Sequence, residues 1–174
     1  MQSKALVLTC IGEDRAGLVE ALAQTVNAHG GNWLQSRMAR LGGRFAGILQ
    51  VEVPPEREAE LLVALAELEG RGLRVVTEAA QGAEPRETPL ELEIIGQDRP
   101  GIVHEISRVL AANGVNVDEL DTGCESAPES GEQLFHARAV LHAPAAVDQE
   151  KLFGELEAIA LDLMVDVVIE APED

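Results

Sequence analysis

Two short polar turns of almost the same sequence could bind a small charged ligand. Residues 12–17 read Gly-Glu-Asp-Arg-Ala-Gly, and residues 96–101 read Gly-Gln-Asp-Arg-Pro-Gly. Each turn follows an alternating apolar segment and precedes a helical pattern, so we expect it at the N-terminal end of a helix. Helix N-termini carry free N–H donors and a partial positive charge, which together can bind a carboxylate.

The residue types within the turns suit this position. The glycine that opens each turn allows the backbone to change direction at the end of a strand, where a Cβ could clash. Asp14 and Asp98 lie just before the expected helices, where a carboxylate can accept an unpaired N–H. Gly17 and Gly101 leave the first helical turn uncovered, so a ligand or another backbone segment could approach closely. Pro100 suits that first turn, because the N–H that proline lacks is not needed there.

Two asparagines follow the expected helices and extend the chemistry of the turns. Asn32 and Asn116 each offer a donor and an acceptor. Free N–H groups, an amide and a carboxylate could satisfy both ends of an amino acid. The same residues could also serve the fold alone, because aspartate commonly caps helices, glycine makes turns, and asparagine tolerates left-handed conformations.

The turns belong to a longer internal repeat. Residues 29–32 (His-Gly-Gly-Asn) match residues 113–116 (Asn-Gly-Val-Asn) at the same offset of 84 residues that separates Gly12 from Gly96. A duplicated strand, turn and helix at this spacing indicates two similar domains and two related sites.

Apolar periodicity predicts the order strand, helix, strand, strand, helix, strand in each half. In the first half these elements are expected at residues 5–10, 18–28, 33–41, 45–53, 58–69 and 73–77. In the second half they are expected at residues 90–95, 100–110, from 116, 134–141, 152–159 and 165–170, with a mobile loop at 125–132. Leu62 is expected to face inward from its helix.

This order predicts an α+β protein with two ferredoxin-like domains, in which both helices cover one face of an antiparallel sheet. We expect the first domain at residues 1–78 and the second at residues 90–171. The segment 79–89 is polar and contains two prolines, so it is expected to be a linker.

Composition argues against several functions. The net charge is −18 and only 2 % of the residues are aromatic, which argues against direct binding of nucleic acid. No apolar run is long enough to span a membrane, and no signal peptide is visible, so a cytoplasmic protein without disulfides is expected. The cysteine and histidine spacings predict no metal site, and no catalytic constellation is present.

The paired turns with the glycine-asparagine segments resemble the ACT domain, a small-molecule-binding regulatory module, in both halves. A closer resemblance is to the glycine cleavage system transcriptional repressor family, which consists of two ACT domains. Its second strand and hairpin are matched by residues 36–42 followed by Phe45. Its third strand and following loop are matched by residues 134–136 leading to residues 142–145.

The resemblance implies a regulator without a DNA-binding domain that senses a small amino acid, such as glycine or serine. It would act by protein contact on a DNA-binding transcription regulator. The candidate ligand-binding residues are carried over as five matched pairs: Gly12 and Gly96, Asp14 and Asp98, Arg15 and Arg99, Gly17 and Gly101, and Asn32 and Asn116. Ala16 departs from the proline that the ACT pattern prefers at this position, whereas the second turn has Pro100 there. The second turn therefore matches the ACT pattern better.

Two other functions stay open. The chain could be a stand-alone ACT subunit that tunes feedback inhibition of an amino-acid biosynthetic enzyme. An enzyme in its own right is disfavoured, and no cofactor is expected. ACT domains often join sheet edges or helix faces, so a homodimer is expected.

Overall fold

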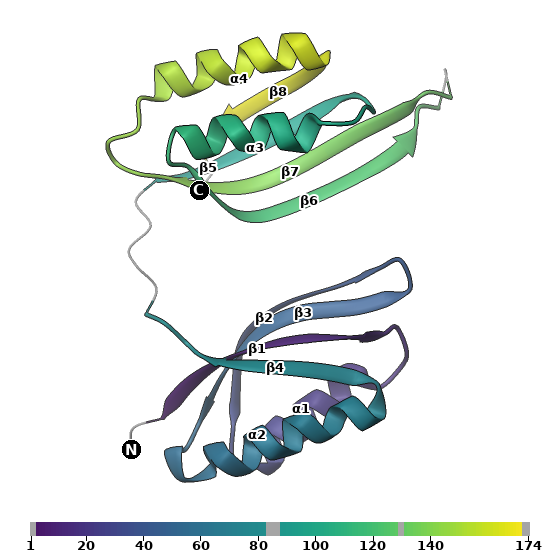
Figure 1. Ribbon diagram of the computed structural model, residues 1–174, viewed down its shortest axis with the longest axis vertical. Coiled ribbons are helices and arrows are strands. Elements are labelled where there is room, and N and C mark those ends of the chain that lie inside the picture. The colour runs from purple at the N-terminus through teal and green to yellow at the C-terminus, as the bar shows by residue number, and fades with distance from the viewer. Residues whose placement is uncertain (1–2, 83–87, 129–130, 172–174) are drawn as a thin grey trace. The chain divides into compact units, whose positions relative to one another are not determined.

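The structure is a computed structural model and describes residues 3–82, 88–128 and 131–171. The chain divides into two compact units, Met1–Ala83 and Glu84–Asp174. Each unit contains a four-stranded antiparallel sheet with two α-helices against one face (Figure 1). The predicted α+β fold of two ferredoxin-like domains is confirmed.

The sheet of the first unit has the strand order β2-β3-β1-β4. Its elements are β1 (Lys4–Glu13), α1 (Leu18–Ala28), β2 (Asn32–Leu41), β3 (Arg44–Val53), the 3-10 helix η1 (Pro55–Arg57), α2 (Glu58–Glu67), the 3-10 helix η2 (Leu68–Arg71) and β4 (Leu73–Ala79). Gly42 and Gly43 both have positive φ and join β2 to β3, as expected for a two-residue hairpin turn.

The sheet of the second unit has the equivalent order β6-β7-β5-β8. Its elements are β5 (Thr88–Gln97), α3 (Ile102–Ala112), β6 (Asn116–Ser126), β7 (Gln133–Ala143), α4 (Gln149–Leu163) and β8 (Val165–Glu170). The same topology in both units therefore places the two repeated turns at equivalent sheet ends.

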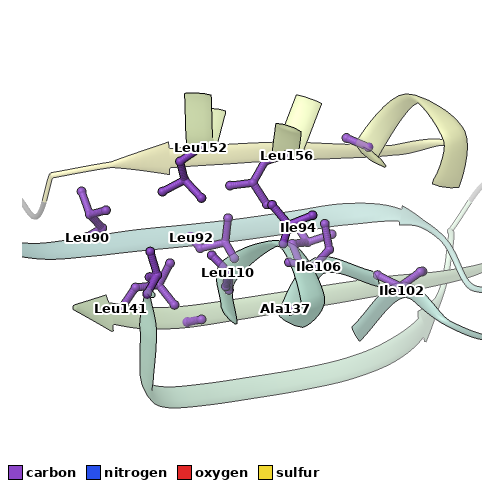
Figure 2. Close-up of a cluster of buried hydrophobic side chains, with 14 of the residues drawn as sticks. Leu90, Leu92, Ile94, Ile102, Ile106, Leu110, Ala137, Leu141, Leu152 and Leu156 are labelled. Carbon is purple, nitrogen blue, oxygen red and sulfur yellow. The ribbon is translucent and has the colours of Figure 1, made fainter. Parts of the chain in front are cut away.

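Each unit has its own apolar core between its sheet and its helices. In β1 the alternation works as predicted, because Leu6, Leu8 and Cys10 are at most 2 % exposed. In the second unit, leucine and isoleucine side chains of β5 meet those of α3 and α4 (Figure 2). Burial of this apolar area is the main force that holds each helix on its sheet.

Several predicted details differ from the structure. The predicted helix 58–69 ends at Glu67 and continues as η2. Leu62, which was expected to face inward, is 38 % exposed, and Val103 at the start of α3 is 41 % exposed. Each follows a buried residue, Leu61 or Ile102, and one helical step of about 100° turns its side chain toward the edge of the buried face.

Strands extend into two segments that were expected to be irregular. Ala79 ends β4, and residues 88–89 begin β5, so both ends of the expected linker lie in strands. Residues 125–126 belong to β6. Residues 83–87 of the linker and 129–130 of the expected mobile loop lie outside the described residues.

Candidate functional site

Within the first unit, the turn and the asparagine lie at opposite ends of the sheet. β1 and β2 are each antiparallel to β3, so they run in the same direction. Gly12 is aligned with the end of β2, whereas Asn32 is aligned through β3 with Ala5. The seven residue-to-residue steps from Ala5 to Gly12 span about 23 Å along a strand. Asn32 and the turn of the first unit are therefore not parts of one site within that unit.

The second unit separates its turn from its asparagine in the same way. Asn116 pairs with His142, which pairs with Pro89 near the start of β5. Gly96 lies near the other end of β5. The predicted ferredoxin-like order already implies this separation, because a strand, a crossover helix and the next strand place the two strands in the same direction.

The first glycine of each turn serves strand packing. Gly12 and Gly96 are the next-to-last residues of β1 and β5 and lie within those strands, before the turns. A Cβ on Gly12 would lie 2.4 Å from the carbonyl oxygen of Gly72, and a Cβ on Gly96 would lie 2.7 Å from Cγ1 of Val165. The sharp turn expected at these glycines is not formed by them, because both lie within strands. The expectation that a Cβ would clash at these strand ends is confirmed, because the neighbouring strand approaches closely.

Asp14 holds the β2-β3 hairpin. Its Oδ2 lies 2.7 Å from Nε of Arg40, and its backbone N–H donates to the carbonyl oxygen of Gly43 at 3.0 Å. The cap of α1 is Gly17, and no side chain accepts a hydrogen bond there. The prediction that Asp14 caps the helix is therefore wrong.

Asp98 makes the equivalent contacts in the second unit. Its backbone N–H donates to the carbonyl oxygen of Gln133 at 2.9 Å, and its carboxylate lies close to the thiol of Cys124 on β6. Partial desolvation raises the pKa of Cys124, and the charge of Asp98 raises it further. Gly101 caps α3 without a side-chain hydrogen bond, so Asp98 is not the helix cap either.

The last glycine of each turn leaves the helix end open, as the sequence predicts. Gly17 and Gly101 have φ of 90° and 99°, and nothing lies within 4 Å of a Cβ built on either. Pro100 precedes this cap, and α3 begins at Ile102, so the expectation that Pro100 lies in the first helical turn is wrong. The N–H groups at both helix starts lack a capping side chain.

A cavity of about 380 Å³ adjoins the open end of α1. The residues relevant to its chemistry are Arg15, Gly17, Glu20, Leu68, Arg71 and Leu73. The guanidinium of Arg15 lies over Gly72, with Nη2 3.1 Å from the position of a Cβ there. The arrangement places two cationic side chains and one carboxylate around a space next to free helix N–H groups.

The charged groups that line this cavity are available to a ligand. Within the described ranges, Arg15, Glu20 and Arg71 form no ion pair or hydrogen bond through their side chains. Two neighbouring arginines without carboxylate partners are notable in a chain with 31 acidic and 13 basic residues. Such groups can bind an anion without first breaking an internal pair.

Sequence reasoning found Arg15 and missed Arg71 and Glu20. Arg71 ends η2, far from the turn in sequence, and reaches it because β4 pairs with β1 next to Gly12. The ferredoxin-like order could have shown that Arg71 lies near the turn, since it predicts that the fourth strand lies beside the first. Glu20 could have been identified from the sequence, because it is an acidic residue in the first turn of the expected helix.

Comparison with known proteins agrees with the fold of both units. Two family models of the ACT domain match the chain, one at residues 4–75 and the other at residues 91–159. The chain is a tandem ACT-domain protein. The first unit is hereafter called the first ACT domain and the second unit the second ACT domain.

The chain is similar to the glycine cleavage system transcriptional repressor of Escherichia coli (strain K12). The identity is 24 % over 162 residues, which cover 91 % of this chain and 85 % of the relative. A protein of unknown function from Galdieria sulphuraria has a similar structure, with a TM-score of 0.88, 30 % identity and coverage of 99 % of this chain and 100 % of that one.

A solved structure described as a candidate glycine cleavage system transcriptional repressor has a TM-score of 0.72 and 18 % identity. The match covers both chains completely. At this identity the likeness shows the fold alone.

The asparagines of the two ACT domains have different surroundings. Asn32 lines a separate cavity of about 380 Å³ together with Gly30, Glu52 and Glu56. Asn116 donates from Nδ2 to Oδ1 of Asp118 at 2.6 Å. Oδ2 of Asp118 also lies close to Nδ1 of His142. The amide of Asn116 is thus held by its neighbour, whereas Asn32 faces an open space.

The described residues also bear on metal binding and on membrane spanning. Among the residues that the structure describes, no three histidine, cysteine, aspartate or glutamate side chains gather in a way that could hold a metal ion. In the same ranges, no helix combines the length and the apolar character needed to cross a membrane.

Proposed function

We propose that this protein is a non-enzymatic regulator that binds a small amino acid, glycine or serine, at the open helix end beside the repeated turn. The observation that carries the proposal is the cavity of about 380 Å³ next to Gly17, where unpaired guanidinium groups meet uncapped helix N–H groups. Its similarity to a glycine cleavage system transcriptional repressor supports the same class of function.

The chemistry of the cavity suits the carboxylate of an amino acid. The N-terminus of α1 adds a partial positive charge, and the guanidinium of Arg15 adds a full one. Gly17 places no side chain over the N–H groups. The volume is at the lower end of the roughly 300–1,000 Å³ range of small-molecule sites, so it suits a small ligand.

We further propose that the signal passes to a DNA-binding transcription regulator through protein contact. Charge supports this proposal because it is unevenly distributed. Residues 1–83 contain eight basic and ten acidic residues and have a net charge of −2. Residues 84–174 contain five basic and 21 acidic residues and have a net charge of −16. DNA-binding surfaces are basic, so the strongly acidic half would attract such a partner and repel DNA itself.

The amino acid would control this contact by shifting an equilibrium. A ligand can favour one state only to the extent that it binds that state more tightly. The proposal includes a cytoplasmic homodimer, in which a domain or subunit rearrangement supplies the two states.

Thermal unfolding in the presence of each of the twenty amino acids tests the ligand. Trp33 is the one tryptophan of the chain and lies in β2, partly buried against the core of the first ACT domain. A ligand at 100 times its Kd should stabilise the folded protein by about 2.7 kcal/mol, which is a shift of several degrees at this size. A shift with glycine or serine supports the proposal, and no shift with any amino acid contradicts it.

Affinity purification of the tagged protein, with and without the active amino acid, tests the partner. Recovery of a DNA-binding regulator whose amount changes with the amino acid supports the proposal. Recovery of the catalytic subunit of an amino-acid biosynthetic enzyme instead would assign the protein to feedback control of that enzyme.

A further inference from the structure

The two ACT domains differ in the residues that surround the same turn. The turn itself is repeated, but its neighbours from the first helix and from the segment before the last strand are not. We propose that the amino acid binds in the first ACT domain alone and that Arg71 and Glu20, which lie outside the repeated turn, select it. This inference rests on the proposed function and adds to it the location and the basis of selectivity.

In the first ACT domain the cavity presents complementary charges for a zwitterion. Arg15 and Arg71 supply guanidinium groups on one part of the lining, and Glu20 supplies a carboxylate. The distances between these groups exceed ion-pair contact, since none of the three is paired within the described ranges. An α-amino acid carries a carboxylate and an ammonium group on one carbon, so it can satisfy both kinds of group at once.

Strand register identifies the equivalent positions in the second ACT domain. Gly12 pairs with Leu73 in the first domain, and Gly96 pairs with Val165 in the second. The two residues before Leu73 are Arg71 and Gly72, and the two before Val165 are Leu163 and Met164. In the second domain an apolar side chain therefore replaces the second guanidinium.

Met164 also changes the space available to the arginine that is repeated in the second turn, Arg99. In the first domain a Cβ on Gly72 would lie only 3.1 Å from Nη2 of Arg15, so the absence of a side chain allows this position of the guanidinium. Met164 adopts the same left-handed backbone, with φ of 54°, and carries a full side chain. A guanidinium of Arg99 in the equivalent position would meet the Cβ of Met164 at a similarly short distance, so Met164 leaves less room there.

The carboxylate of the first site is also replaced. Glu20 is the third residue of α1, and the third residue of α3 is His104. A histidine does not attract an ammonium group as a carboxylate does. The second domain therefore retains the turn and Arg99 but lacks the counterparts of Arg71 and Glu20 that would recognise a zwitterion.

Isothermal titration calorimetry of the full chain with glycine and with serine tests the inference. We expect one ligand per chain for the wild type. Arg71→Leu, which installs the residue found in the second domain, should weaken binding at least about ten-fold, because a charge-assisted hydrogen bond is lost. Glu20→Gln should weaken it similarly, whereas Arg74→Leu on β4, outside the cavity lining, and Leu163→Ala should leave the Kd unchanged. The Trp33-detected transition verifies that the variants of the first domain are folded, and circular dichroism verifies the folding of Leu163→Ala, because the second domain contains no tryptophan.

Ligand analogues test the recognition of both charges. Acetate lacks the ammonium group, and glycinamide lacks the carboxylate. Each should bind at least ten-fold more weakly than glycine, and Glu20→Gln should not alter the binding of acetate.

The outcomes separate the two levels of the proposal. If the wild type binds no amino acid, the proposed function fails and this inference fails with it. If the wild type binds an amino acid with unchanged Kd after Arg71→Leu and Glu20→Gln, or binds two per chain, only the assignment to the first ACT domain is overturned.

Discussion

The carboxylate of Asp14 and the guanidinium of Arg40 form an ion pair across the β2-β3 hairpin, with Oδ2 2.7 Å from Nε. The equivalent position to Arg40 in the second ACT domain is Cys124, whose pKa is raised by desolvation and by the nearby carboxylate of Asp98. The aspartate of the repeated turn therefore contacts the edge strand in both domains. Its role is to connect the turn to the hairpin, which leaves the helix N-terminus open.

This relationship predicts that Asp14 contributes modestly to stability and little to ligand binding. Arg40 is largely exposed, so the pair should contribute about 0.2–1 kcal/mol. In a double-mutant cycle with Asp14→Ala and Arg40→Ala, followed by Trp33 fluorescence in urea, the double variant should lose less than the sum of the single variants. Additive losses would show that the pair does not interact in solution. A loss of the amino-acid response in Asp14→Ala would assign the carboxylate to the ligand instead.

The close approach at Gly12 predicts a strong steric effect. Gly12→Ala should destabilise the first ACT domain by roughly 1–3 kcal/mol, because the new Cβ would overlap the carbonyl oxygen of Gly72 and the strands must separate. Gly70→Ala is the matched control, since nothing lies within 4 Å of a Cβ there and its φ is not in the left-handed range. Equal urea midpoints for the two variants would contradict the steric explanation.

The contact between Asp98 and Cys124 predicts a pH-dependent reactivity. Desolvation and then the carboxylate of Asp98 raise the pKa of Cys124, so the thiolate is less populated near pH 8 than in a free cysteine. Because the thiolate is the reactive form, Asp98→Asn should lower the pKa and speed alkylation by iodoacetamide. The difference should vanish at a pH above both pKa values.

Asp121→Asn controls for the general loss of a negative charge on β6. Cys10 is 1 % exposed and should stay unreactive in the folded protein. Mass spectrometry of the alkylated peptides separates the two thiols. An alkylation rate that is unchanged in Asp98→Asn would show that the carboxylate does not act on Cys124.

The fold could be predicted because each half repeats a clear pattern. Alternation at Leu6, Leu8 and Cys10 marks a strand with one buried face, and glycines mark the ends of helices. The burial of a side chain was predicted wrongly where apolar periodicity fits two adjacent helix positions equally well. Leu62 follows a buried leucine by a single position, and a helix that contacts its sheet along a narrow stripe leaves such a residue partly exposed.

The candidate site could be predicted only in part, because its residues come together through long-range pairing. The open helix end at Gly17 is a local property and was predicted. Arg71 joins the turn only when β4 pairs with β1, and Asn32 leaves it only because β2 and β1 run in the same direction. Similarity to the ACT domain grouped residues by family motif, which does not show whether they meet within one domain.

The conformation of Met164 predicts that glycine stabilises the second ACT domain. A non-glycine residue in the left-handed region costs about 1–3 kcal/mol, and the greater freedom of glycine in the unfolded chain offsets about 0.5–1 kcal/mol of the gain. Met164 is 66 % exposed, so little apolar burial is lost. Met164→Gly should therefore stabilise this domain by roughly 1 kcal/mol. Circular dichroism follows its unfolding, because the second domain contains no tryptophan.

Met164→Ala separates backbone strain from the loss of the side chain. Alanine removes the exposed thioether but keeps the Cβ that disfavours the left-handed conformation, so it should give no comparable gain. The Trp33-detected transition of the first domain should change in neither variant. Equal stabilisation by alanine and glycine would assign the effect to the side chain. Destabilisation by glycine would show that the side chain of Met164 makes a contact that stabilises the domain by more than the left-handed backbone destabilises it.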